Sequence, residues 1–522
     1  MPILFHGKLP IDSVSAHLAY FKSRPYRTFA LSAMTLSCLM MSGCLMGPNY
    51  ARPKDTLPTS YTEKVAEETT VANSTNDMNA ESQHFVDKDI PSQWWEVFHS
   101  PALNDLVTSS LQHNPNVAAA QATLRAAMEN VQAQQGAYYP TVNAAYAASR
   151  QKTASILASP LASNSYIYNL QTAQVNVSYT LDLFGANRRQ VESLQAQADS
   201  SRFGLEGTYL TLTSNVVNAA IQEAMLRDQI RVTHQLITTQ KALLDTIKHR
   251  QALGDASTID VATQDAALAT IEATLPPLEK QLAVQRDLIK SLTGKFPSDT
   301  LTEQFSMTSF ELPHELPTSL PSTLVEHRPD VRAAEEQLRA ANANVGAATA
   351  NRLPNITLGV SSYGSSGKTL ADLLKSTSQF WTLAGGITQP IFDGGILKHK
   401  QRVAQAQYDL ATAQYRSTVL SAFQNVADVL QSIQSDTIAL ETALRSERLA
   451  QKNAAIARQQ VALGDMSIAT LLPIEQNAQQ AELNLVQIQA NRLQDTAALF
   501  QALGGGWWNK SEQSTLPHNI NE

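Results

Sequence analysis

The chain has 522 residues, of which 16% are charged and 6% are aromatic, and its formal net charge is −7. The acidic balance and the lack of a basic patch exclude a nucleic-acid-binding protein. Its two cysteines, Cys38 and Cys44, both lie near the N-terminus, which excludes a disulfide framework or a cysteine metal site in the rest of the chain.

Residues 1–43 have the pattern of an export signal. Basic residues precede an apolar run from Phe29 to Met41, which is too short to cross a membrane as a helix. Small residues then precede Cys44, as at a site where a signal peptide is removed and the cysteine is acylated. Leu45 follows, where an aspartate would favour retention in the inner membrane. The sequence therefore predicts a covalent lipid on Cys44; plain signal cleavage, with the cysteine incidental, is the alternative.

Helical patterns in the first part of the chain break near Pro115 and stop before Pro140. After them, the spacing of apolar residues changes from that of a helix to that of a strand. Apolar and polar residues alternate strictly over residues 173–181, and a weaker strand covers residues 142–148. The second half of the chain has the same pattern over residues 356–360 and 381–387. Each half thus offers two strands with one apolar and one polar face.

This alternation has two interpretations. The ordinary one is a half-buried sheet in water. About ten alternating residues is also the length of a transmembrane barrel strand, and the neighbouring helical patterns offer no globular core. Four strands cannot close a barrel, and lipid does not tolerate an open sheet edge. Three copies of the chain would give about twelve strands, so the sequence predicts a homotrimer whose shared barrel contacts lipid.

The longest predicted helix runs from about Ala186 to Gln251. Ile230, Ile237 and Leu244 follow a seven-residue spacing, which indicates a coiled-coil seam. At 1.5 Å per residue this helix would be a rod of about 100 Å, too long for a compact domain with a single core.

An internal duplication relates the two halves of the chain. The sequence Ala-Leu-Gly-Asp closes the long helix at residues 252–255 and returns at residues 462–465. His113 likewise corresponds to His327, and a second long helix is expected from about Gly395 to Val461. The predicted organisation is a signal peptide (1–43), an extended N-terminal segment (44–92), a first repeat (93–297), a linker (298–320), a second repeat (321–505) and a polar tail (506–522).

These features together resemble the TolC-type outer-membrane efflux factors, and most closely their lipoprotein branch, represented by OprM and the NodT-like proteins. The resemblance covers nearly all of residues 44–506. It is carried by Cys44 with Gly47-Pro48-Asn49-Tyr50, Trp94-Trp95 with Pro101-Ala102-Leu103, Leu181-Asp182-Leu183-Phe184-Gly185, Arg328-Pro329-Asp330-Val331-Arg332-Ala333-Ala334-Glu335, and Pro390-Ile391-Phe392-Asp393-Gly394-Gly395.

The resemblance implies an α+β membrane protein of the Gram-negative outer membrane. Long antiparallel coiled-coil helices would form an α-barrel in the periplasm, and each chain would add four strands to a trimeric, 12-stranded transmembrane β-barrel. The implied function is the outer-membrane channel of a tripartite efflux system that exports small molecules or drugs. Its expected partners are a periplasmic adaptor and a proton-driven inner-membrane pump.

Two other functions stay open. The first is the exit duct of a type I polypeptide secretion system, which uses the same architecture with a different pump. The second is an exported coiled-coil structural protein, which would leave the alternating strands unexplained.

The resemblance also places adaptor docking at two helix-turn-helix tips. The matching segments are Ala252–Ser257 and Ala462–Ser467. The candidate docking residues are Leu253, Gly254, Asp255 and Ser257 in the first tip and Leu463, Gly464, Asp465 and Ser467 in the second. The alternative is that the two glycines only end their helices, since glycine readily adopts the left-handed conformation found there.

Members of the family often narrow the tip with acidic residues just after the turn. Thr470 and Pro473 occupy the matching positions of the second repeat, so that acidic pair is not present here. The first repeat offers Asp260 and Asp265 just after its turn, and Glu475 lies close to the matching positions of the second repeat. A carboxylate ring tripled by symmetry would raise the cation occupancy of a constriction. Solvated acids on helix faces are the alternative.

No enzymatic site is predicted. The sequence has no His/Cys/Asp cluster with metal-ligand spacing, no glycine-rich phosphate loop and no serine in a nucleophile elbow. We therefore expect no cofactor other than the lipid on Cys44, and a partner protein must supply the energy for transport.

Overall fold

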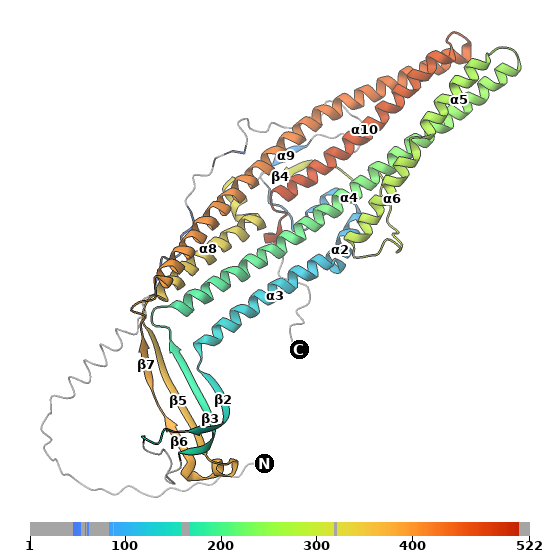
Figure 1. Ribbon diagram of the computed structural model, residues 1–522. Helices are drawn as coiled ribbons and strands as arrows, with labels where there is room; N and C mark the ends of the chain where they lie inside the picture. The colour runs from blue at the N-terminus through green and yellow to red at the C-terminus, as the bar shows by residue number, and fades with distance from the viewer. Residues whose placement is uncertain are drawn as a thin grey trace, which may run out of the picture.

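The structure is a computed structural model that describes residues 45–53, 58, 60–61, 83–86, 88–157, 166–317 and 321–510. The predicted signal peptide, Cys44 and the end of the polar tail lie outside the described residues. The molecule is elongated, with a sheet at one end, long helices through the middle and two helical hairpins at the other end (Figure 1).

The order of elements reflects the duplication. The helices are α2 (Pro101–His113), α3 (Pro115–Gln135), α4 (Ala186–Ala252), α5 (Thr258–Glu272), α6 (Leu275–Leu292), α7 (Pro321–His327), α8 (Pro329–Ala350), α9 (Ile396–Leu463) and α10 (Ile468–Ala502). The strands are β1 (His84–Val86), β2 (Thr141–Lys152), β3 (Ile167–Leu181), β4 (Glu315–Pro317), β5 (Asn355–Gly367), β6 (Gln379–Thr382) and β7 (Gly385–Thr388). Of the helices that the structure describes, none has the length and hydrophobicity needed to cross a membrane.

Both predicted long helices are present. Helices α4 and α9 have 67 and 68 residues, so each is a rod of about 100 Å. Many of the buried positions of α9 are alanine, for example Ala422 and Ala454. Small side chains at these positions let α9 lie close against α8 and α10.

The main core lies where the middle parts of α4 and α9 and the C-terminal half of α10 meet the short helix η1 (Trp94–Phe98). Trp94 is 1% exposed and stacks on Phe500, with 5.6 Å between the ring centroids. Large aromatic side chains bury much apolar surface at such positions. This core joins the first repeat to the end of the second.

The pairing of β1 with β4 could not be predicted from the sequence. Strand β4, in the segment predicted as the linker, pairs in parallel with β1 of the N-terminal segment, with Phe85 opposite Leu316. A strand of three residues is too short to give a periodic signal.

The sheet has the order β2-β3-β5, with β6 and β7 each paired to β5, and all its pairs are antiparallel. The predicted strands of the first repeat are confirmed but are longer than predicted. The strand predicted over 381–387 is wrong as one continuous element, since the chain leaves the sheet at Leu383-Ala384 between β6 and β7.

The strand register brings the apolar residues of separate strands onto one face. Ala144, Val175, Tyr363 and Trp381 lie directly opposite one another across four strands. Polar residues form the neighbouring row on the other face, where the hydroxyl of Ser362 donates to Asn176 at 2.9 Å. The sheet is therefore amphipathic, as predicted.

A β-bulge in β5 keeps this face continuous. Ser361 lies opposite Val177, whereas Leu358 lies opposite Tyr179, so β5 has one extra residue between the two pairs. A bulge shifts the phase of the alternation, and Leu358 thereby joins the face that carries Tyr363. The uninterrupted alternation predicted through Val360 is corrected here.

Candidate functional site

The two hairpin tips have nearly the same backbone. Gly254 has φ +82° and Gly464 has φ +85°, so both occupy the left-handed region in which glycine is favoured. The amide of Asp255 donates to the carbonyl of Arg250 at 2.8 Å, and the amide of Asp465 donates to that of Gln460 at 2.9 Å. These bonds satisfy the last carbonyls of α4 and α9. The predicted role of the glycines in ending the helices is therefore confirmed.

The tips are also open to a partner. A Cβ added at Gly254 or Gly464 would meet no other atom within 4 Å. Leu253 is 84% exposed and Leu463 is 69% exposed. Apolar side chains presented this openly at the ends of two hairpins are available for contacts with another molecule. Docking of an adaptor at these residues stays a prediction.

The two serines at the tips begin the returning helices. Ser257 accepts a hydrogen bond from the Asp260 amide at 3.2 Å, and the Asp260 carboxylate accepts one from the Ser257 amide at 2.8 Å. This reciprocal capping box satisfies two amides at the start of α5. Ser467 accepts from the Thr470 amide at 3.3 Å in the same way at the start of α10.

The three predicted constriction acids have different environments. Asp260 is the acidic partner of Ser257 in the capping box of α5, and hydrogen bonds from Ser257 lower its pKa. Glu475 is a buried side chain, 4% exposed, and its Oε2 accepts from Arg458 of α9 at 2.7 Å. Asp265 is exposed on α5. The structure thus gives Asp260 and Glu475 structural partners within their own hairpins.

A groove separates the two hairpins near the tips. It has a volume of about 620 Å³. Small and apolar side chains form much of its lining, and Arg250, Arg458 and Glu475 add charge. Its lining residues are Thr239, Gln240, Ala242, Leu243, Thr246 and Arg250 of α4, Arg458, Val461, Ala462, Leu463 and Gly464 at the end of α9, and Leu471 and Glu475 of α10.

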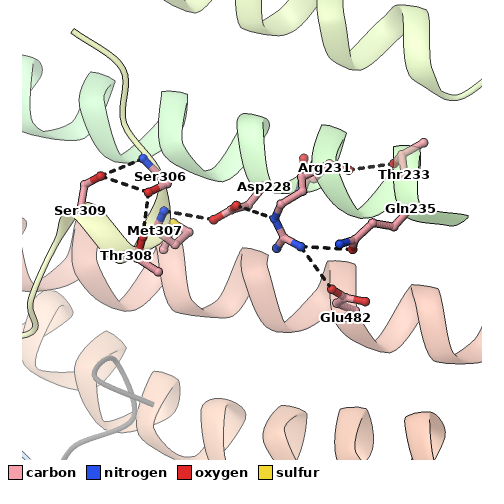
Figure 2. A network of polar contacts seen from close by, with 10 residues as sticks. Asp228, Arg231, Thr233, Gln235, Ser306, Met307, Thr308, Ser309 and Glu482 are labelled. Atoms are coloured by element: carbon pink, nitrogen blue, oxygen red, sulfur yellow. Dashed lines mark hydrogen bonds and ion pairs between the residues drawn. The ribbon is translucent and has the colours of Figure 1, made fainter. Parts of the chain in front are cut away.

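A polar network joins the hairpins farther from the tips (Figure 2). Arg231 of α4 contacts Asp228 at 3.1 Å and reaches Glu482 of α10 at 3.9 Å. Asp228 also accepts from the amide of Met307, in the short helix η3 (Met307–Ser309) between the repeats. Gln451 of α9 donates to Glu482 at 3.3 Å. The network links both repeats and the segment between them, and sequence reasoning missed it because its members are distant in sequence.

Side chains that could hold a metal are not gathered in this region or elsewhere in the described ranges. No group of three or more His, Cys, Asp or Glu residues there lies close enough to bind a metal ion.

Comparisons with known proteins agree on one family. Residues 106–295 and 320–505 match the family model described as outer membrane efflux protein. The chain is 29% identical to the pyoverdine export outer membrane protein OpmQ of Pseudomonas putida, over 80% of this chain and 89% of that protein. It is 27% identical to the antibiotic efflux pump outer membrane protein ArpC of Pseudomonas putida, over 94% of this chain and 99% of that protein. The solved structure of the outer-membrane channel OprN matches with a TM-score of 0.78 and 26% identity, over 89% of this chain and all of that one.

Proposed function

Because this chain belongs to the family of outer membrane efflux proteins, we propose that it is the exit channel through which a tripartite pump exports small molecules. It is an efflux channel of the Gram-negative outer membrane and not an enzyme. The resemblance drawn from its motifs is thereby confirmed. One relative is named for pyoverdine export and another for antibiotic efflux, which favours a small-molecule cargo over a polypeptide.

The observation that carries the proposal is the groove between the two exposed tips. Both hairpins contribute to its walls, and small or apolar side chains along a groove can accommodate a partner helix. We assign docking of a periplasmic adaptor to this surface, with Leu253 and Leu463 as its most exposed apolar contacts. The adaptor would connect the channel to an inner-membrane pump, which we expect to be proton-driven.

The sheet supports assembly as a homotrimer. Within the described residues, one edge of the sheet is β2 and the other is formed by β6 and β7, and neither edge has a further partner strand. Lipid cannot satisfy the backbone groups of an open edge. Three copies, joined edge to edge, would close a barrel with the apolar row that contains Val175 facing lipid.

Two further proposals concern single residues, the lipid attachment site and the acid of the constriction. Cys44 would carry the lipid, because small residues precede it at the end of the export signal. Asp265 is the constriction candidate that we retain as a lumen-facing acid, since Asp260 and Glu475 already have partners in their hairpins.

An efflux assay tests the small-molecule proposal. In cells that lack this chain but keep their pumps, a fluorescent cationic dye should accumulate, and the wild-type chain should restore its efflux. Secretion of polypeptides should be the same with and without the chain. Unchanged dye efflux together with a loss of polypeptide secretion would instead support the type I exit duct.

A further inference from the structure

A buried arginine holds the segment that follows the cysteine. We call residues Leu45–Arg52 the N-terminal strap. Arg189 of α4 is 1% exposed. Its guanidinium donates to the carbonyls of Met46 and Gly47 at 3.1 and 3.2 Å and to the side-chain oxygen of Asn49 at 2.9 Å. The remaining guanidinium nitrogen, Nη1, pairs with the Glu192 carboxylate at 2.7 Å. The rigid fork of an arginine thus binds three oxygens of the strap at once.

Gly346 of α8, in the second repeat, forms the opposite wall of this site. Gly47 has φ +87°, and a Cβ placed there would lie 2.5 Å from the Cα of Gly346 on α8. A Cβ at Gly346 would in turn lie 2.9 Å from Arg189 and from the Met46 carbonyl. The strap therefore contacts the backbone of α8 at a point where neither chain segment has room for a side chain.

Further contacts fix both ends of the strap. At the sheet end, the amide of Met46 donates to the carbonyl of Phe184, in the turn between β3 and α4, at 3.2 Å. Farther along α8, Asn342 donates to the Pro48 carbonyl at 3.0 Å. At the other end of the strap, Arg52 pairs with the buried Glu335 of α8 at 2.8 Å.

These contacts connect three parts of the fold: the sheet-to-helix turn of the first repeat, the start of α4, and α8 of the second repeat. Without the strap, Arg189 would keep Glu192 as its partner but would lose three of its acceptors. A buried charge that loses its partners is strongly destabilising. The site is thus built around a bound peptide segment.

We propose that Arg189, Asn342 and Gly346 form a receptor site for the N-terminal strap, and that the bound strap locks the sheet-to-helix turn of the first repeat onto the second repeat. Arg189 is the positioning residue of this lock. The inference goes beyond the channel function, and its link to the membrane depends on the proposed lipid. Since Leu45, the first residue of the strap, directly follows Cys44 in the sequence, a lipid on Cys44 would be attached next to the strap.

Hydrogen exchange of the full-length mature protein, purified as a trimer in detergent, tests the receptor site. Arg189→Met should raise the exchange rate of the strap amides at least about 10-fold. The matched control Arg202→Met changes an arginine of the same helix that lies over Phe203, and it should leave strap exchange unchanged. Normal exchange in β2 and α5 would show that the fold is intact. Wild-type strap exchange in an intact Arg189→Met trimer would overturn the proposal.

A second variant keeps the test decisive if Arg189→Met does not assemble. Asn342→Leu removes the hydrogen bond to Pro48 while Arg189 stays in place, and it should raise strap exchange several-fold. If exchange stays at the wild-type rate in Asn342→Leu, the receptor site is refuted as well.

A variant without the lipid separates this inference from the lipidation proposal. Cys44→Ala, exported with a signal peptide that is cleaved without acylation, should lose palmitate labelling but keep slow strap exchange. Persistent labelling would refute Cys44 as the lipid site and leave the receptor site standing. Fast strap exchange in this variant would mean that the lipid holds the strap, which would refute the receptor site.

Discussion

Val175→Arg is expected to lower the amount of assembled trimer more than about 10-fold. The side chain of Val175 lies in the apolar row with Ala144, Tyr363 and Trp381. If this row faces lipid, arginine near the middle of the bilayer costs about 2–4 kcal/mol in each copy. The assembled fraction can be measured in isolated outer membranes, from the trimer band that survives on gels run without boiling.

The neighbouring residue provides the control for this charge. Asn176 follows Val175 in β3 and belongs to the polar face, where Ser362 donates to it. Asn176→Arg loses one hydrogen bond but places its charge toward the proposed aqueous lumen, so assembly should stay close to normal. If Asn176→Arg blocks assembly and Val175→Arg does not, the lipid-facing and lumen-facing sides have been assigned the wrong way round.

Gly464→Trp is expected to reduce small-molecule efflux at least about 10-fold while trimer levels stay normal. A Cβ at this position meets no other atom within 4 Å, and Gly464 lines the groove between the hairpins, so an indole there would block the approach of an adaptor to the tip. The backbone cost of a side chain at φ +85° is about 1–2 kcal/mol. Efflux in cells and trimer bands from the same cells give the two measurements.

Gly464→Ala separates strain from bulk. Alanine has the same left-handed strain as tryptophan at this position but adds only a methyl group. Efflux should therefore stay near the wild-type level in Gly464→Ala. Equal efflux in the alanine and tryptophan variants would argue against docking at this tip, whether both retain efflux or both lose it.

The long helices could be predicted from the sequence because their signals are local. Helix α4 was expected from about Ala186 to Gln251 and runs from Ala186 to Ala252. No proline interrupts it, its apolar residues keep the coiled-coil spacing, and Gly254 supplies the left-handed turn that ends it. These properties depend on neighbours along the chain and not on the rest of the fold.

The sheet and the site could be predicted only in part. A two-residue period identifies strands but does not reveal their partners, so the bulge opposite Val177 and the break between β6 and β7 were missed. Glu475 was considered as a constriction acid because of its place after the turn, yet in the fold it pairs with Arg458. Such pairs depend on residues of another helix, and one sequence without its fold does not show them.

The role of Arg189 could not have been predicted from local patterns. It lies in a polar stretch at the start of α4, beside the more exposed Arg188. Its acceptors are far away in sequence, at Met46, Gly47 and Asn49. The motif Gly47-Pro48-Asn49-Tyr50 supported the family resemblance, but only the fold shows what it contacts.

Photo-cross-linking from the tips in living cells tests directly whether this channel docks an efflux adaptor there. A photoreactive amino acid is placed at Leu253 or Leu463, and at Ile156, which is 92% exposed at the sheet end, as a control. Both tip positions should capture a periplasmic adaptor that belongs to an efflux pump, and Ile156 should not. Gly464→Trp should reduce the capture from Leu463. Capture of an ATP-driven secretion partner at the tips would contradict small-molecule efflux, and capture of the adaptor only at Ile156 would contradict docking at the tips.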